Sequence, residues 1–238
     1  YLILRNSSDI NPMKLLFPLL SALIITASAA CSKTNDYDLT KWPADADPYR
    51  VGLILAEKFL ATPYKNSGDV TSVEPPSQIV YSEVCTWLGG IWFAEASGDK
   101  ELLTRLQARF DPLFDTLSFL LPPPNHVDNN VFGSVPLEFW LINREKRYLD
   151  LGLHYADSQW ILPDSTGPGE KAYADRGYTW QTRIWIDDMF MITAVQSQAY
   201  RATGDIKYID RAAKEMILYL DTIQLETGLF YHAPYAHF

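Results

Sequence analysis

From Pro48 onward the chain is a succession of helical patterns, each closed by a stop rich in Gly, Pro, Asn or Ser. Apolar residues recur every three or four positions, and no segment of any length alternates with the period of a strand. Pro112 and Pro136 are expected to kink or restart two of the helices. The sequence therefore predicts an all-α fold with a long loop at 162–178. Helices are expected at about 49–60, 80–96, 100–120, 131–142, 147–161, 185–203 and 206–222.

One kind of turn between helices recurs three times, at 96–103, 142–150 and 202–210. Matching Leu102, Tyr148 and Tyr208 gives spacings of 46 residues (148 minus 102) and 60 residues (208 minus 148). A helical hairpin that recurs at such a period predicts an α-solenoid or its closed form, an α/α toroid. Asp128 and Asp187 would meet in one cleft in a toroid and lie on separate repeats in a solenoid. The repeat alone leaves both arrangements open.

The composition narrows the class of partner. A formal net charge of −9 argues against nucleic-acid binding, which needs a basic surface. Aromatic residues make up 13% of the chain, which favours a site where rings stack on sugars, although large cores use aromatics as well. The chain has no Walker loop, dinucleotide fingerprint, HExxH or paired CxxC motif. Neither a cofactor nor a metal is therefore expected.

The first residues predict export rather than a folded element. Residues 13–30 combine Lys14 with an apolar run and small residues, as in a secretory signal peptide, and residues 1–12 are expected to be a translation artefact upstream of Met13. The small residues before Cys31 resemble a bacterial lipoprotein signal. Cys31 is then the lipidated residue and 31–46 its tether, which places the protein in the bacterial cell envelope, periplasmic or on the outer membrane. Only the lipid anchor would contact the membrane.

The other cysteine, Cys85, lies in an apolar stretch and is expected to be a buried, inert thiol.

An acidic pair, Asp187-Asp188, interrupts an aromatic and Met-rich stretch. A charge buried there would cost several kcal/mol unless it is paired or protonated, on the order of 2–7 kcal/mol for a polar group alone. The pattern opens a helix near Trp185, with Asp187 in its first turn. Two interpretations are open: either acid caps the helix and complements its dipole, or one of them is a general acid.

An ordered set of motifs resembles the unsaturated uronyl hydrolases, the rhamnogalacturonyl and glucuronyl hydrolases of glycoside hydrolase families 105 and 88. The resemblance covers about 79–238 and implies an (α/α)6 barrel, so that 47–238 would be a partial α/α-toroid catalytic domain. The motifs are the turn at 126–130 with its continuation to 149, the stretch 185–191, the turn at 202–208 and the segment 227–233.

The resemblance also implies roles for individual residues. The general acid/base of the family falls on Asp187 and its second carboxylate on Asp128, while His232 and Tyr81 fall on substrate-binding positions. Asp188 stands where relatives usually carry Gly, so Asp187 and Asp188 both remain candidates for the proton donor.

Three more residues are candidates to bind the substrate. Trp180 and Trp185 are sugar platforms or core residues, and Arg183 is a candidate to compensate the charge of an anionic substrate.

The implied substrate is an oligosaccharide ending in a 4,5-unsaturated uronic acid, left by a polysaccharide lyase. Asp187 would protonate C4 and then help a water add at C5, and Asp128 would orient ring hydroxyls, without metal or nucleotide. The alternatives are another α/α-toroid carbohydrate enzyme, either an epimerase or an ordinary glycosidase, and a non-catalytic glycan-binding surface lipoprotein.

The family carries further motifs and helices beyond the one that ends near His232. The chain is therefore expected to be a C-terminally truncated fragment with uncovered apolar faces and little or no activity.

Overall fold

The computed structural model describes residues 41–43, 45–64 and 74–234. The chain divides into two compact units, Tyr1–Ala46 and Asp47–Phe238. In the first unit the described part is a short turn in which Ala46 N–H donates to Pro43 O at 2.8 Å. The proposed leader, Cys31 and most of the proposed tether lie outside the described residues.

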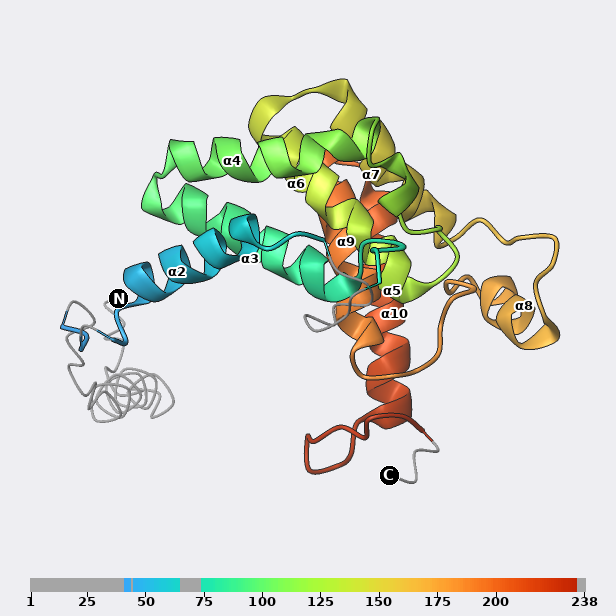
Figure 1. The fold of residues 1–238 in the computed structure, drawn as a ribbon. Helices are drawn as coiled ribbons and strands as arrows, with labels where there is room; N and C mark the ends of the chain where they lie inside the picture. The colour runs from blue at the N-terminus through green and yellow to red at the C-terminus, as the bar shows by residue number, and fades with distance from the viewer. Residues whose placement is uncertain (1–40, 44, 65–73, 235–238) are drawn as a thin grey trace, which may run out of the picture. The chain divides into compact units, whose positions relative to one another are not determined.

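The second unit is all-α, as predicted (Figure 1). Among its described residues the pairing of Gln224 with Phe230 is an isolated bridge, and no strand forms. In the same ranges, no helix has the length and apolar character needed to cross a membrane. The helices are α2 Pro48–Ala61, α3 Tyr81–Ser97, α4 Lys100–Phe110, α5 Val127–Asn130, α6 Ser134–Asn143, α7 Lys146–Ser158, α8 Pro168–Asp175, α9 Asp188–Thr203 and α10 Ile206–Ile223, with 3-10 turns η2 Asp111–Phe114, η3 Ser118–Leu120 and η4 Val131–Gly133.

The three recurring turns share a left-handed residue at the end of a helix, and two of them also share an aspartate cap. Gly98 and Gly204 end α3 and α9 in the left-handed conformation, with φ of 71° and 72°, which glycine adopts without strain. The next residue, Asp99 or Asp205, caps the following helix by accepting a backbone N–H. Arg144 takes the left-handed position after α6, with φ of 61°. The repeat therefore marks antiparallel helical hairpins, and α3 with α4, α6 with α7 and α9 with α10 pack as pairs.

Several predicted boundaries were wrong for local reasons. The third predicted helix ends at Phe110, because Pro112 removes a helical N–H and the chain continues as η2 and η3. The fourth is divided between η4 and α6, the turn expected before it contains α5, and α7 ends three residues before Ile161. The predicted loop 162–178 contains α8, which has no buried residue and therefore no apolar stripe in the sequence. α9 begins at Asp188, three residues after Trp185.

The core is dominated by aromatic rings. Phe110, at the end of α4, is fully buried and contacts Trp87, Phe132, Phe139 and Tyr148 with ring centroids 5.4–5.8 Å apart. Such offset and edge contacts add to the free energy of burial and fix the relative angles of α3, α4, α6 and α7. The elements that carry the candidate site, α5 and α9, pack on each other and on this scaffold.

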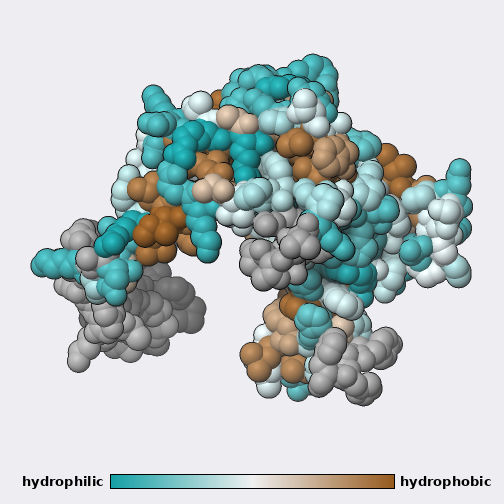
Figure 2. All heavy atoms as spheres, viewed as in Figure 1, coloured by the Kyte–Doolittle hydropathy of each residue, from teal (hydrophilic) through white to brown (hydrophobic). Residues whose placement is uncertain are grey.

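The exposed side of α2 is apolar. Val51, Ile54 and Leu55 are all exposed, and Figure 2 shows hydrophobic side chains gathered over this helix. A contiguous apolar surface of this kind is usually covered by another element or partner.

Close packing of α7 against α6 depends on Gly152. A Cβ at this position would lie 2.4 Å from Leu137 Cγ and 3.0 Å from the carbonyl oxygen of Gly133. Gly152→Ala is expected to destabilise the fold by about 1–3 kcal/mol through overpacking, measured by urea unfolding. Gly89→Ala in α3, where nothing lies within 4 Å of the added Cβ, is the matched control. Helix propensity should make that variant more stable by up to about 1 kcal/mol, and equal effects at both positions would contradict the packing argument.

Candidate active site

One wall of the site is the short helix α5. His126 is extended and caps it: the His126 Nδ1 accepts the Asp128 N–H at 3.2 Å. Because the imidazole takes the capping role, the Asp128 carboxylate is left to point away from its own backbone. Gln78 Nε2 donates to Asn129 Oδ1 at 3.0 Å and ties this wall to the segment before α3.

The opposite wall is the start of α9. Asp188 N–H donates to Trp185 O at 2.9 Å, closing a turn before the helix. Asp187 is the N-cap residue rather than a first-turn residue, and its side chain makes no capping hydrogen bond. Burial was expected for the acidic pair, but only Asp188 is buried, at 0% exposed, while Asp187 is exposed. The sequence could not separate the two because adjacent residues at a helix start face different sides.

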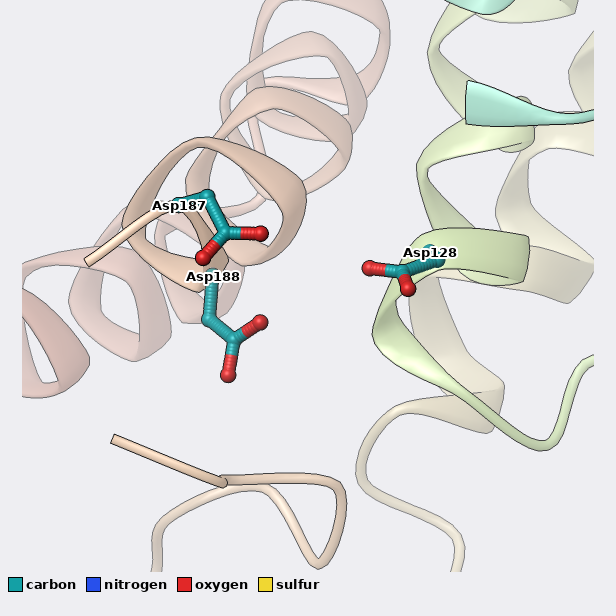
Figure 3. Close-up of side chains that lie close together, drawn as sticks. All are labelled: Asp128, Asp187 and Asp188. Carbon is teal, nitrogen blue, oxygen red and sulfur yellow. The ribbon is translucent and has the colours of Figure 1, made fainter. Parts of the chain in front are cut away.

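Asp128, Asp187 and Asp188 meet across this gap. An oxygen of each carboxylate lies within 4.8 Å of the others, and Figure 3 shows the Asp128 side chain on α5 directed at the two on α9. The meeting of two acids 59 positions apart (187 minus 128) is the geometry expected of the toroid and not of a solenoid. Asp128 and Asp187 therefore lie close together, and their shared role in catalysis stays a prediction.

Arg183 lies among these carboxylates. Its Nε donates to both oxygens of Asp188 at 3.2 Å, and Nη2 also donates to that carboxylate. Nη2 reaches Asp128 Oδ1 at 3.1 Å, and Nη1 lies 3.2 Å from His126 Nε2. The guanidinium also lies over the Trp185 ring, 4.8 Å from its centroid. One cation thus compensates two of the three acids.

Burial is the main cause that raises the pKa of Asp188, and the neighbouring charge of Asp187 acts in the same direction. The Arg183 hydrogen bonds act against it and favour the ionised form. Tyr219 O–H donates to Asp188 Oδ2 at 3.3 Å, and burial raises the pKa of this phenol as well. The tyrosine therefore stays a neutral donor.

Carboxylate oxygens at this spacing are ligands that Mg²⁺ or Ca²⁺ use. Here the Arg183 guanidinium already lies against two of the three carboxylates and supplies positive charge at that place. A metal-free site stays a prediction.

A pocket of about 320 Å³ opens beside Asp128. Tyr81, the first residue of α3, lines it together with His126 and Asp128. Tyr81 thus begins the second predicted helix and shares a pocket with Asp128, and its role in substrate binding stays a prediction. The remaining lining residues are Gln78, Val80, Ser82 and Asn129.

His232 is connected to the site by contact of its ring with Trp185. The two rings have centroids 5.4 Å apart, and Ile186 N–H donates to His232 O at 2.9 Å. Trp185 is 39% exposed, as a sugar platform requires. Trp180 is only 8% exposed and its indole N–H donates to Ser158 O at 3.0 Å, so this ring packs in the interior and offers no open face.

A larger pocket, of about 580 Å³, lies between α2 and α3 and contains none of the three acids. Cys85 is on its wall and is exposed, so the expected burial of this thiol was wrong. Partial burial of the sulfur still raises the pKa of the thiol, which keeps it protonated and weakly reactive.

The sequence reasoning missed two residues, His126 and Glu215. His126 was noted only as part of a turn, but it contacts both Asp128 and Arg183. Glu215 is 1% exposed and accepts from Thr179 N–H at 2.5 Å and Thr182 O–H at 3.2 Å. A signal existed for Glu215, because it occupies the buried stripe of α10, seven residues after Tyr208 and four before Tyr219.

Comparison with protein families matches residues 56–236 to Glycosyl Hydrolase Family 88. The match includes every helix from α3 to α10 and all three acids. Comparison with curated proteins and with solved structures gives no match. The chain belongs to glycosyl hydrolase family 88, whose members are glycoside hydrolases that act on unsaturated uronides.

Glu215 makes stability depend on pH. Burial raises the pKa of Glu215 to about 7, above its value in an unfolded chain. The folded state therefore holds the proton more tightly, and this contribution is full below about pH 4 and lost as the pH rises to about 7. Wild type should lose about 3 kcal/mol more than Glu215→Gln between about pH 5 and pH 8 in urea unfolding. Glu226→Gln, at an exposed position, should keep the wild-type slope, and a Glu215→Gln slope equal to wild type would contradict the assignment.

Proposed function

We propose that this glycoside hydrolase removes a terminal 4,5-unsaturated uronic acid from lyase-generated oligosaccharides by hydrating the C4=C5 enol ether. The observation that carries the proposal is that carboxylate oxygens of Asp128 and Asp187 lie within 4.8 Å of each other, and that Asp128 lines a pocket. Family membership gives the class of reaction, and the resemblance of the motifs to family 105 favours an unsaturated rhamnogalacturonyl substrate within it.

The chemistry needs one carboxyl group that first donates and then accepts a proton. Protonated Asp187 adds its proton to C4, which leaves an oxocarbenium-like cation shared by C5 and the ring oxygen. The resulting carboxylate takes a proton from a water as the water oxygen bonds to C5. The hemiketal opens by breaking the bond between C5 and the ring oxygen. The C5 hydroxyl proton passes to the former ring oxygen, so C5 becomes a ketone and C1 a hemiacetal. The bond between C1 and the glycosidic oxygen then breaks, C1 becomes an aldehyde, and the hemiacetal proton passes to the oxygen of the departing sugar.

The choice of Asp187 over Asp188 rests on access. Asp188 is buried and its oxygens accept from Arg183 and Tyr219, so a sugar carbon has no path to them. Asp187 is exposed at the start of α9, on the side that faces Asp128. Asp128 has Oδ1 bound to Arg183, and its Oδ2, 3.5 Å from His126 Nδ1, would orient a ring hydroxyl.

The alternatives fit less well. An epimerase does not belong to a glycoside hydrolase family, and a binding module would not require a solvent-accessible acid opposite a second carboxylate. An ordinary glycosidase needs a carboxyl pair aimed at an exocyclic oxygen. Equal rates of cleavage of saturated and unsaturated uronides would identify the protein as an ordinary glycosidase.

The setting of the enzyme is also part of the proposal. We propose a secretory leader at 13–30, lipid attachment at Cys31 and residence in the bacterial cell envelope, where lyase products of large polysaccharides would be met. The exposed apolar side of α2 would be covered by another element or a partner.

The decisive substitution is Asp187→Asn. It keeps the size of the side chain but removes the proton donor, and kcat should fall by about 10²–10⁴-fold on unsaturated rhamnogalacturonyl and glucuronyl disaccharides. Turnover is measured as the loss of ultraviolet absorbance of the conjugated double bond. Asp210→Asn, at an exposed position on α10, is the control and should match wild type. Turnover that survives Asp187→Asn would remove the acid/base role from this residue.

Substitution of the two tryptophans should have different effects, on KM for Trp185 and on the free energy of folding for Trp180. Trp185→Ala removes an exposed ring beside His232 and should raise KM by about 10-fold or more, as loss of a stacking surface does, with little change in the urea midpoint. Trp180→Ala creates a cavity and should cost about 3–5 kcal/mol of folding free energy. The assignment fails if Trp180→Ala raises KM in a protein of unchanged stability.

A further inference from the structure

Arg183 was predicted to bind the anionic substrate, but its hydrogen bonds point to another role. A guanidinium has five N–H donors in a fixed fork. Nε and one Nη2 donor are directed at Asp188, and the second Nη2 donor is directed at Asp128. Because His126 Nδ1 accepts the Asp128 N–H, the neutral imidazole carries its proton on Nε2 and does not accept from Arg183 Nη1, 3.2 Å away. Among the described residues this leaves only the donors of one nitrogen, Nη1, for any further partner. A bidentate grip on a substrate carboxylate would require breaking bonds that already exist.

The Asp188 carboxylate that holds the Arg183 guanidinium is itself fixed in place. Asp188 is fully buried and also accepts from Tyr219 O–H on α10, so its carboxylate is fixed from two directions. Removing one partner of a buried charge pair usually costs about 3–5 kcal/mol because the other charge is left uncompensated. The anchor is therefore stiff, and Arg183 has little freedom to swing toward a ligand.

The backbone beside Arg183 is held in an unfavourable conformation. Ile184 has φ of 62°, which is rare for a β-branched residue and costs of the order of 1–3 kcal/mol. The Ile184 side chain is only 3% exposed, and its packing in the core offsets this backbone strain. The result is that Arg183 points to the gap between α5 and α9 while Trp185, two residues on, faces solvent under the guanidinium.

From these contacts we propose that Arg183 and Asp188 are positioning residues for hydration of the unsaturated uronide, and that Arg183 is not the anchor of the substrate carboxylate. Arg183 joins the wall that carries Asp128 to the wall that carries Asp187, and it thereby fixes the gap in which the sugar ring lies between them. Asp188 acts only through Arg183. The inference rests on the proposed function for the reaction whose geometry is being set.

Kinetics of Arg183→Lys distinguish positioning from substrate anchoring. Lysine keeps the charge but lacks the fork that joins the two walls. With an unsaturated galacturonyl disaccharide, kcat should fall by about 10²-fold and KM should change by less than about 3-fold. The methyl ester of the same disaccharide, which lacks the carboxylate charge, should lose kcat by the same factor. An unchanged kcat with a raised KM, or loss of the preference for acid over ester, would overturn the inference.

Companion variants test the anchor. Tyr219→Phe removes one hydrogen bond to Asp188 and should lower kcat by a few-fold, on the order of one lost hydrogen bond, without raising KM. Asp188→Asn should resemble Arg183→Lys; if it does not fold, Tyr219→Phe still decides. Arg144→Lys, at an exposed position after α6, is the matched control and should equal wild type.

A measurement without turnover separates this inference from the proposed function. In full-length protein the urea midpoints of Arg183→Lys, Asp128→Asn and the double variant form a cycle. If Arg183 joins the two walls, the double variant should shift the midpoint by clearly less than the two single shifts together. Additive shifts would overturn the inference, even in an active enzyme. A wild-type protein that turns over no unsaturated uronide would refute the proposed function. The cycle of urea midpoints would still show whether Arg183 and Asp128 are coupled.

Discussion

The ion pair of Arg183 with Asp188 is the interaction on which the rest of the site depends. A buried carboxylate is costly in isolation, and here the cost is offset by a guanidinium fork and a tyrosine hydroxyl. The same guanidinium also donates a hydrogen bond to Asp128. The ion pair that stabilises the buried Asp188 carboxylate therefore also connects α5 and α9, which are distant in sequence. Asp187 is thereby the acid of the cluster that remains exposed to solvent and ligand.

The fold was predictable where its causes are local. Glycine in a left-handed turn followed by an aspartate cap can be read directly from Gly98-Asp99 and Gly204-Asp205, and the hairpins that they join are present. The apolar stripe of α10 predicted a helix whose bounds differ by one residue from those observed. The pairing of Asp128 with Asp187 came from the resemblance of ordered motifs, since spacing alone left toroid and solenoid equally possible.

The remaining features depend on contacts that no local pattern contains. The start of α9 was misplaced because the chain from Trp185 first closes a turn, in which Asp188 N–H donates to Trp185 O, before the helix begins. The division of labour between Asp187 and Asp188 follows from Arg183 and Tyr219, which approach from different elements. An indole and its neighbour five residues away, Trp180 and Trp185, have opposite exposures although the sequence around them is equally aromatic.

The segment after α10 has a consequence for how the site is held together. Tyr231 N–H donates to Ile223 O at the end of α10, and Ile186 N–H donates to His232 O one residue later. The imidazole next to Trp185 is thus attached to the end of α10, while Asp187, the proposed proton donor, caps α9. Sliding of these two packed helices along each other would move the His232 imidazole away from Trp185 and Asp187, so the register of the α9/α10 hairpin sets the distance between the imidazole and the acid.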